Sequence, residues 1–215
     1  MEVKRVAFNS GSLSLEGMLA IPEGTGPFPA VVVCHPHPLY GGTMDNNIVD
    51  GVCKALVQLP LISLRFNFRG VGRSEGQFGQ EVGEQQDIGA AISFASTIER
   101  VDRAAIGLAG YSAGAGFAIP VVLRDTHIKA FAAISPPLSM FDFETLKSYP
   151  KAKLFISGSR DNFTPVSQFL QFCRNLPEPK EYATIEGADH FWWGHEADVA
   201  ASVATFFAKA LKGLQ

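Results

Sequence analysis

A serine flanked by small residues is the feature of this sequence best suited to chemistry. Two segments have the spacing Gly-x-Ser-x-Gly, one around Ser74 (residues 72–76) and one around Ser112 (residues 110–114). Glycine accounts for 21 of the 215 residues, so a chance match of so short a pattern is common enough that the pattern alone decides little. The residues on either side of each serine must distinguish the two.

Ser112 stands between an apolar run at 105–109 and the small residues Ala-Gly-Ala-Gly at 113–116. A strand, a tight turn and a helix are predicted here. That arrangement exposes a nucleophilic serine at a helix N-terminus, which favours developing negative charge. Ser74 is followed by Gly, Gln and Phe residues with no helical pattern, so we expect it to be a loop residue. The alternative for Ser112 is a passive hydroxyl in a glycine-rich turn.

A serine hydroxyl attacks efficiently only when a nearby base accepts its proton. Where the serine occupies such a turn, the chain order is serine, acidic residue, histidine. Of the five histidines, His190 and His195 follow Ser112 with a predicted strand end and an acidic residue in between. His190 lies a few residues after the last predicted strand, where a loop can carry an imidazole over the sheet edge, so it is the preferred base. His195 opens the closing helix and is the alternative.

The preferred acid is Asp161, which comes just after the apolar run at 153–157. A carboxylate there would accept a hydrogen bond from the imidazole, fix its tautomer and stabilise the imidazolium. Asp142, after the preceding predicted strand, is the second choice, and Asp189 is adjacent to His190 but is expected to point elsewhere. The alternative role for Asp161 is to form the turn.

Backbone N–H groups must hold the oxyanion of an acyl-transfer reaction. The residue after the nucleophile, Ala113, is expected to supply one, and the segment 34–42 (Cys-His-Pro-His-Pro-Leu-Tyr-Gly-Gly) the other. Proline has no N–H, so the second donor must be His37, Leu39, Tyr40 or Gly41. We prefer His37, because its flanking prolines would hold the amide rigid, as a preorganised donor requires.

Other residues near this segment have weaker interpretations. Tyr40 and Tyr111, beside the oxyanion segment and the nucleophile, are predicted substrate contacts. A reactive Cys34 is an alternative to a simply buried thiol. His35 and His37 are close enough in sequence to share a metal ion, but no third ligand is evident and proline disturbs the geometry, so no metal site is predicted.

Short apolar runs alternate with longer amphipathic segments along the chain. The first two predicted strands form a hairpin with its turn at 9–12, and strands separated by helices require a mostly parallel sheet covered on both faces. Ligands bind such sheets beyond the carboxyl ends of the strands. The predicted strands are 3–8, 13–20, 30–34, 61–68, 105–109, 129–134, 153–157 and 180–185, and the predicted helices are 47–59, 84–98, 113–123, 168–174 and 197–212.

Together these residues resemble the α/β-hydrolase superfamily, and more narrowly the small bacterial predicted hydrolases related to dienelactone hydrolases and serine aminopeptidases. The resemblance extends from about residue 31 to the C-terminus, and its most specific segments are 35–42, 65–76 and 110–114. It implies an α/β-hydrolase fold with Ser112, Asp161 and His190 as the catalytic triad, and places Ser74 in a structural loop.

The chain also departs from its apparent relatives. Dienelactone hydrolases use a cysteine where Ser112 stands, so their substrate is not transferred to this chain. Many relatives insert a lid after the sixth strand, whereas here only residues 135–151 separate that strand from the next, enough for one short helix at 143–149. We therefore expect one α/β domain over residues 1–215, a sheet of about eight strands, no lid and an open site.

Composition excludes several other classes of protein. The chain has a net charge of −3, with 47% apolar and 18% charged residues, as a compact globular protein has. No run of Lys or Arg offers a surface for nucleic acid. No apolar stretch approaches the ~20 residues that span a bilayer, and the first residues lack the apolar core of a signal peptide. The three cysteines have no metal-ligand spacing, which favours reduced thiols in a cytoplasmic protein.

The sequence thus predicts a serine hydrolase that cleaves a small carboxylic ester or thioester through an acyl-enzyme on Ser112, without a cofactor. Its predicted partner is a small ester-like substrate, and the sequence leaves the oligomeric state open. Peptidase or amidase action on short substrates needs the same residues, and a non-catalytic binding protein could use the same scaffold.

Overall fold

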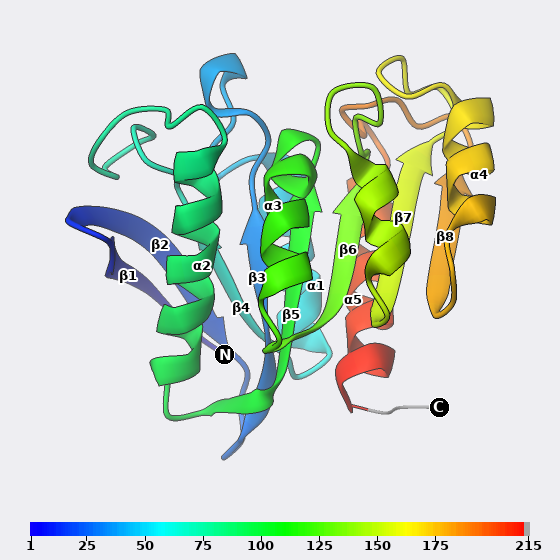
Figure 1. The fold of residues 1–215 in the computed structure, drawn as a ribbon. Coiled ribbons are helices and arrows are strands. Elements are labelled where there is room, and N and C mark those ends of the chain that lie inside the picture. The colour runs from blue at the N-terminus through cyan, green and yellow to red at the C-terminus, as the bar shows by residue number, and fades with distance from the viewer. Residues whose placement is uncertain (213–215) are drawn as a thin grey trace.

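The computed structural model describes residues 1–212, which form a single mixed sheet with helices on both faces (Figure 1). The sheet has the strand order β1-β2-β4-β3-β5-β6-β7-β8, with β3 to β8 parallel and the β1–β2 hairpin joined antiparallel to β4. The prediction of a mostly parallel, eight-stranded α/β fold is therefore confirmed. The strands are β1 (Glu2–Ser10), β2 (Leu13–Ile21), β3 (Phe28–Cys34), β4 (Ile62–Phe66), β5 (Val101–Tyr111), β6 (Ile128–Ile134), β7 (Ala152–Gly158) and β8 (Lys180–Ile185).

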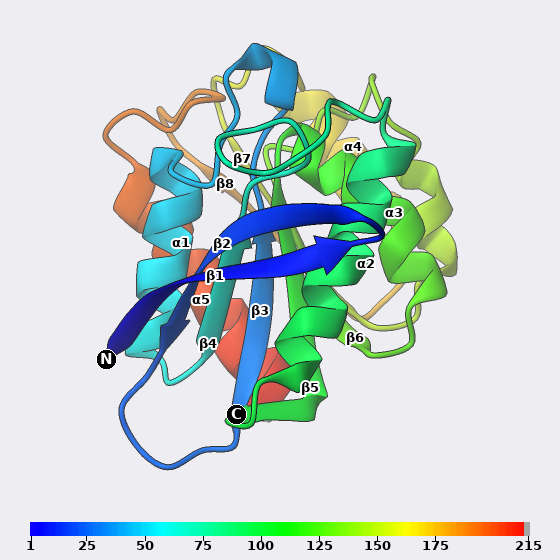
Figure 2. The ribbon, with the colours of Figure 1, turned by 90° about the vertical axis from the view of Figure 1, so that its left-hand side faces the viewer.

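The helices divide between the two faces of the sheet, as the edge-on view in Figure 2 shows. On one face α1 (Asn47–Gln58) packs beside α5 (Glu196–Lys212). The other face carries α2 (Val82–Thr97), α3 (Ala113–Arg124) and α4 (Val166–Asn175). Two short 3₁₀ helices, η1 (Pro38–Tyr40) and η2 (Phe143–Ser148), lie in loops after β3 and β6.

Strand β3 shows why a continuous apolar run is required in the centre of the sheet. Val31 and Val33 point into the core beneath α1 and α5, whereas Val32 and Cys34 point into the core beneath α2 and α3. Successive side chains of a strand alternate between its faces, so a strand covered on both sides favours apolar residues at successive positions. The run that predicted this strand is thus a direct consequence of two-sided burial.

Helix α3 corrects one expectation. Pro120 lies inside the helix predicted at 113–123, and a proline there is expected to kink a helix or end it early, because it lacks an N–H and crowds the preceding turn. The helix instead continues to Arg124, so the early end is wrong. Phe117, Ile119 and Val121 are all buried around the proline, and packing of this kind stabilises a helix more than propensity does.

The carboxyl ends of the parallel strands are open. Residues 135–151, between β6 and β7, contain only η2 and its flanking loops, so the expectation of no lid is confirmed. Among the described residues, no helix is both long enough and apolar enough to cross a membrane. The last three residues of the predicted domain, 213–215, lie outside the described part of the chain.

Candidate active site

Ser112 occupies a sharp turn between β5 and α3. Its backbone has φ +53° and ψ −124°, a conformation that residues with a side chain rarely adopt. Its N–H donates to the carbonyl oxygen of Ile134 at the end of the neighbouring strand β6, at 2.8 Å. The turn is thereby fixed to the sheet, and the serine side chain lies at the N-terminal end of α3.

The glycines around Ser112 are required by close backbone contacts. A Cβ at Gly110 would lie 2.5 Å from the backbone of Ala115, and one at Gly114 would lie 2.4 Å from the carbonyl oxygen of His35. Separations below about 3 Å do not occur for real side chains, so both positions exclude any other residue. The segment around Ser74 has no such turn, since no helix begins there.

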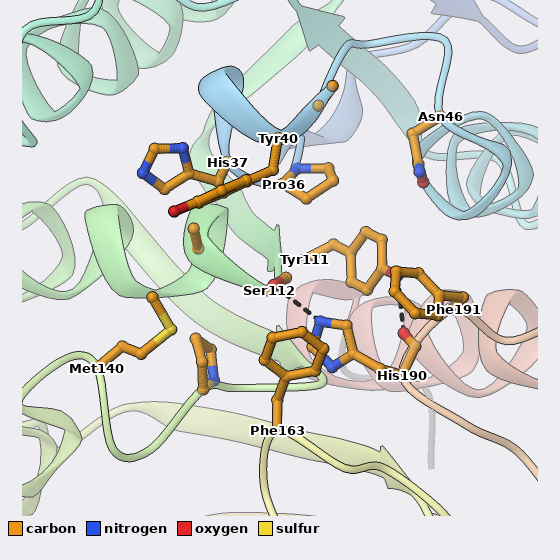
Figure 3. A pocket seen from close by; sticks show the side chains of 14 residues that line it. Pro36, His37, Tyr40, Asn46, Tyr111, Ser112, Met140, Phe163, His190 and Phe191 are labelled. Atoms are coloured by element: carbon orange, nitrogen blue, oxygen red, sulfur yellow. Dashed lines mark hydrogen bonds between the residues drawn. The ribbon is translucent and has the colours of Figure 1, made fainter.

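Ser112, His190 and Asp161 form a continuous hydrogen-bonded chain. Nε2 of His190 lies 3.0 Å from the hydroxyl oxygen of Ser112, and Nδ1 lies 2.9 Å from Oδ2 of Asp161. Figure 3 shows the imidazole pointing at the serine hydroxyl. The three residues follow β5, β7 and β8, so the parallel sheet brings together side chains distant in the sequence. Both His190 and Asp161 are buried.

Asp161 is held in its ionised form. Burial acts to raise the pKa of this carboxyl, but the hydrogen bond and charge of His190 outweigh it, together with the backbone N–H groups of Phe163 and Thr164, and hold the pKa below its usual value. Those two N–H groups donate to Oδ1 at 2.9 and 3.2 Å, while Oδ2 lies 2.9 Å from Nδ1 of His190 and also accepts the hydroxyl of Ser157 at 3.3 Å. A carboxylate with both oxygens engaged fixes the orientation of the imidazole.

Tyr111 positions the loop that carries His190. Its hydroxyl donates to the carbonyl oxygen of His190 at 2.7 Å, and burial raises the pKa of this hydroxyl. The ring lines the cavity above Ser112, where it was predicted to contact substrate. Its hydroxyl, however, is already engaged and its side chain is buried, so Tyr111 has no free polar group to offer a ligand.

The residues considered as alternative acids and as the alternative base make hydrogen bonds elsewhere, outside the series Ser112–His190–Asp161. Nδ1 of His195 lies 3.2 Å from Oδ2 of Asp198 at the start of α5. Asp142 accepts the N–H of Glu144 and begins η2. Asp189 accepts the N–H groups of Phe191 and Trp192 and shapes the loop after β8. Each side chain thus has a local structural role.

The oxyanion segment leaves few amides free. The N–H groups of Tyr40 and Gly42 donate to the carbonyl oxygen of His37, that of Gly41 donates to Pro38, and that of Leu39 donates to Nδ1 of His37. Among the described residues, the N–H groups of His37 and Ala113 have no hydrogen-bond partner. These two amides are the pair that the sequence favoured as oxyanion donors.

His35 connects this segment to the strand beside it. Its Nε2 accepts the N–H of Phe68 at 3.1 Å, and its Nδ1 contacts the carbonyl oxygen of Pro36 at 2.6 Å. Burial lowers the pKa of His35 to about 4, so the ring is neutral and donates from Nδ1. With both nitrogens engaged, this histidine serves the loop backbone. Cys34 is likewise fully buried, and burial raises the pKa of its thiol, which disfavours the reactive thiolate.

Ser74 lies in the loop after β4, as predicted. Its hydroxyl donates to the carbonyl oxygen of Asn67 at 2.7 Å and accepts the N–H of Glu16 at 3.1 Å. Asn67 in turn accepts the N–H of Met44, in the loop that follows the oxyanion segment, at 2.7 Å. The hydrogen bonds of Ser74 and Asn67 thus form a brace between the loop after β4 and the loop that follows the oxyanion segment.

A cavity of about 630 Å³ opens over Ser112. Figure 3 shows rings and a thioether around it, with Tyr40 at the upper rim and Phe163 beside the imidazole. Tyr40, predicted to contact substrate, is 85% exposed. The lining residues are Pro36, His37, Tyr40, Gly41, Gly42, Asn46, Tyr111, Ser112, Ala113, Pro137, Met140, Phe163, His190 and Phe191.

Several lining residues escaped sequence reasoning. Phe163 lies two residues after Asp161 and Phe191 directly after His190, so proximity to the predicted acid and base was a usable signal. Phe191 belongs to the cavity wall, whereas the neighbouring Trp192 is buried in the core. Met140 and Asn46 carried no signal, because their place depends on how two loops fold.

A mostly parallel sheet with a serine on a positive-φ turn after a central strand is the architecture of α/β serine hydrolases. Comparison with known families agrees: residues 30–204 match the model of the alpha/beta hydrolase domain. The chain belongs to this family.

Individual relatives cover most of the chain. An uncharacterised protein of Rickettsia prowazekii is 34% identical in an alignment of 197 residues, which covers 87% of this chain and 82% of the relative. An α/β serine hydrolase homologue from Coxiella burnetii is 31% identical, with a TM-score of 0.85 over 94% of this chain and 96% of that one. An α/β serine hydrolase without a lid from Xanthomonas campestris has a TM-score of 0.86 at 24% identity, over 100% of this chain and 97% of that one. The similarity to the Xanthomonas campestris structure is evidence for the fold alone.

Proposed function

We propose that this hydrolase cleaves a small carboxylic ester or thioester through an acyl-enzyme on Ser112. The observation that carries the proposal is the unbroken hydrogen-bonded chain from the Ser112 hydroxyl through His190 to an ionised Asp161. Activation of serine requires a base within hydrogen-bond reach and a group that orients this base. A binding protein requires neither.

In the first half of the proposed reaction, Nε2 of His190 accepts the proton of Ser112 as Oγ bonds to the carbonyl carbon. Charge develops on the carbonyl oxygen, where the free N–H groups of His37 and Ala113 and the N-terminal end of α3 stabilise it. Asp161 stabilises the imidazolium. The tetrahedral intermediate then expels the alcohol or thiol, which takes the proton from Nε2 and leaves the acyl group on Ser112.

In the second half, water replaces the departed alcohol. His190 accepts a proton from this water, whose oxygen attacks the acyl carbon, and then returns the proton to Oγ as the carboxylic acid leaves. The open cavity above Ser112 admits water to the acyl-enzyme. Hydrolysis therefore needs no group beyond those that carry out acylation.

The test is covalent labelling with a fluorophosphonate, read by intact mass and peptide mapping. We expect one adduct, on Ser112, and none in Ser112→Ala or His190→Ala proteins that fold normally by circular dichroism. Ser74→Ala is the matched control, because this serine has the same flanking pattern, and its variant should still give one adduct on Ser112.

Absence of an adduct on well-folded native protein would contradict the proposal and favour a non-catalytic binding protein. If labelling succeeds, matched ester, thioester and anilide substrates with one acyl group identify the bond that is cleaved. Faster cleavage of the anilide would replace the ester proposal with amidase action on the same residues.

A cytoplasmic location and a small-molecule substrate complete the proposal. The three cysteines are free thiols in the structure, which supports a reducing compartment. The cavity volume of about 630 Å³ suits a small ligand. Fractionation of cells that produce the protein tests the location, which recovery in a secreted fraction would contradict.

A further inference from the structure

The cavity has a distinct leaving-group side. In the proposed reaction the departing alcohol takes its proton from Nε2 of His190, so it must lie beside the imidazole when the bond breaks. Two phenylalanines flank the imidazole there, Phe163 from the loop after β7 and Phe191 from the loop after β8 (Figure 3).

The two rings form a corner around His190. The ring centroid of Phe163 lies 4.3 Å from that of the imidazole, and the ring of Phe191 lies 5.5 Å away, turned by 85°. The two phenyl planes meet at 87° with their centroids 6.4 Å apart. One ring of a ligand placed in this corner could meet Phe163 and Phe191 with a face and an edge, the geometries that aromatic pairs prefer.

Both rings are anchored through their own backbones. The N–H of Phe163 donates to Asp161 and that of Phe191 to Asp189, each at 2.9 Å. The side chains nevertheless remain about half exposed, at 51% and 53%. An apolar ligand would therefore cover ring surface that is now in water, without any rearrangement of the loops.

The wall of the cavity offers no Lys or Arg to an anionic leaving group. None of the described residues that line the cavity is Lys, Arg, Asp or Glu. Arg160 lies on the loop that carries Phe163 but does not line the cavity, and the two loops also hold the carboxylates of Asp161 and Asp189. A leaving group with phosphates or a carboxylate would therefore lose water without gaining a cationic partner in the cavity wall.

We propose that the leaving group is an uncharged aromatic alcohol, bound in the corner of Phe163 and Phe191. This inference rests on the proposed ester hydrolysis and specifies its substrate class. The ester C–O bond breaks, its electron pair stays on the alcohol oxygen, the proton from Nε2 of His190 neutralises that oxygen, and the acyl group remains on Ser112.

The test compares acetate esters of three alcohols whose leaving oxygens are all on a CH₂ group: benzyl alcohol, cyclohexylmethanol and 4-(hydroxymethyl)benzoate. The quantity is kcat/KM, which reports the steps up to acylation while the alcohol is still bound. We expect benzyl acetate to exceed the cyclohexylmethyl ester by about three- to tenfold. The carboxylate ester should fall at least about tenfold below benzyl acetate.

Variants of the two phenylalanines test whether the preference for the benzyl ester arises from the corner that they form. Phe191→Leu keeps an apolar side chain but removes a ring, and should bring the benzyl to cyclohexylmethyl ratio close to one, while Phe191→Tyr should retain the ratio. Trp193→Leu is the matched control. Trp193 is an exposed aromatic side chain on the same loop that does not line the cavity, and its variant should keep the native ratio.

Equal kcat/KM for the benzyl and cyclohexylmethyl esters would overturn the proposal, as would equal values for the charged and uncharged benzyl esters. A preference that survives Phe191→Leu and Phe163→Leu together would also overturn it. These results are distinct from failure of the proposed function. In that case no ester is hydrolysed and the fluorophosphonate leaves Ser112 unmodified.

Discussion

At the scale of single residues, the reacting groups of the candidate site are held by neighbours that do not react. The Tyr111 hydroxyl holds the backbone of His190, and the backbone of Phe163 holds the carboxylate of Asp161. A nucleophile and its base must keep their separation within fractions of an ångström, so the removal of such supports affects rate more than stability.

Tyr111→Phe tests this distinction. The change removes the 2.7 Å bond to the carbonyl oxygen of His190 and should lower the free energy of unfolding by only about 1 kcal/mol. The rate of fluorophosphonate labelling should fall several-fold, because the imidazole is less well positioned. The matched control is Tyr149→Phe, since the buried Tyr149 hydroxyl has no hydrogen-bond partner among the described residues. A labelling rate in Tyr111→Phe equal to that of the control would contradict the positioning role.

His35 makes stability depend on pH. Its pKa is about 4 in the folded protein against an ordinary 6.5, so between these values the unfolded chain binds a proton that the folded chain does not. Stability from this group is complete above pH 6.5 and decreases as pH falls, by roughly 3 kcal/mol in total near pH 4. Urea unfolding at several pH values should show a shallower decline for His35→Gln. Parallel curves for the two proteins would contradict the assignment.

At the scale of elements, the turn between β5 and α3 requires a close approach of two backbone segments. Gly114→Ala would place a Cβ 2.4 Å from the carbonyl oxygen of His35, which is backbone and cannot rotate away. We expect a loss of about 2–4 kcal/mol in unfolding free energy, together with loss of labelling at Ser112. Gly89→Ala, within α2, meets no atom within 4 Å and should stabilise the protein by about 0.5–1 kcal/mol. Thermal unfolding of both variants checks the pair.

The elements themselves were largely predictable. Two-sided burial gives apolar runs such as that of β3, and the small residues after Ser112 are dictated by contacts between strand and helix. The sequence also allowed the serine, the acid and the histidine to be placed together, because each follows a predicted strand and parallel strands end at a common edge of the sheet. Pro120 was misjudged, since a local rule about proline was outweighed by tertiary packing around α3.

The walls of the site were not predictable in the same way. Met140 and Asn46 reach the cavity from loops whose paths depend on contacts distant in sequence. The brace formed by Ser74, Asn67 and Met44 is likewise a set of side-chain-to-backbone bonds between three segments. Periodicity describes faces of helices and strands, and it contains no information about such loop contacts.

At the scale of the whole molecule, no segment within residues 1–212 closes over the site. Residues 135–151 between β6 and β7 hold only η2, and Ser112 faces an open cavity. Enzymes with a lid gain activity when a movable cover opens, and we predict no such step for this protein. We expect the rate to follow a simple saturation curve as the concentration of a sparingly soluble ester passes its solubility limit. A sharp rise in rate at that limit would contradict the prediction.

The candidate nucleophile and base are separated by 78 residues along the chain. In the proposed mechanism the serine is therefore synthesised long before the imidazole that activates it, and it would be unreactive until β8 and the loop after it have joined the sheet. A partly made or truncated chain would then carry an unreactive serine. If Ser112 labels as proposed, its reaction with a fluorophosphonate would report completed assembly of the protein, and could be used to follow folding.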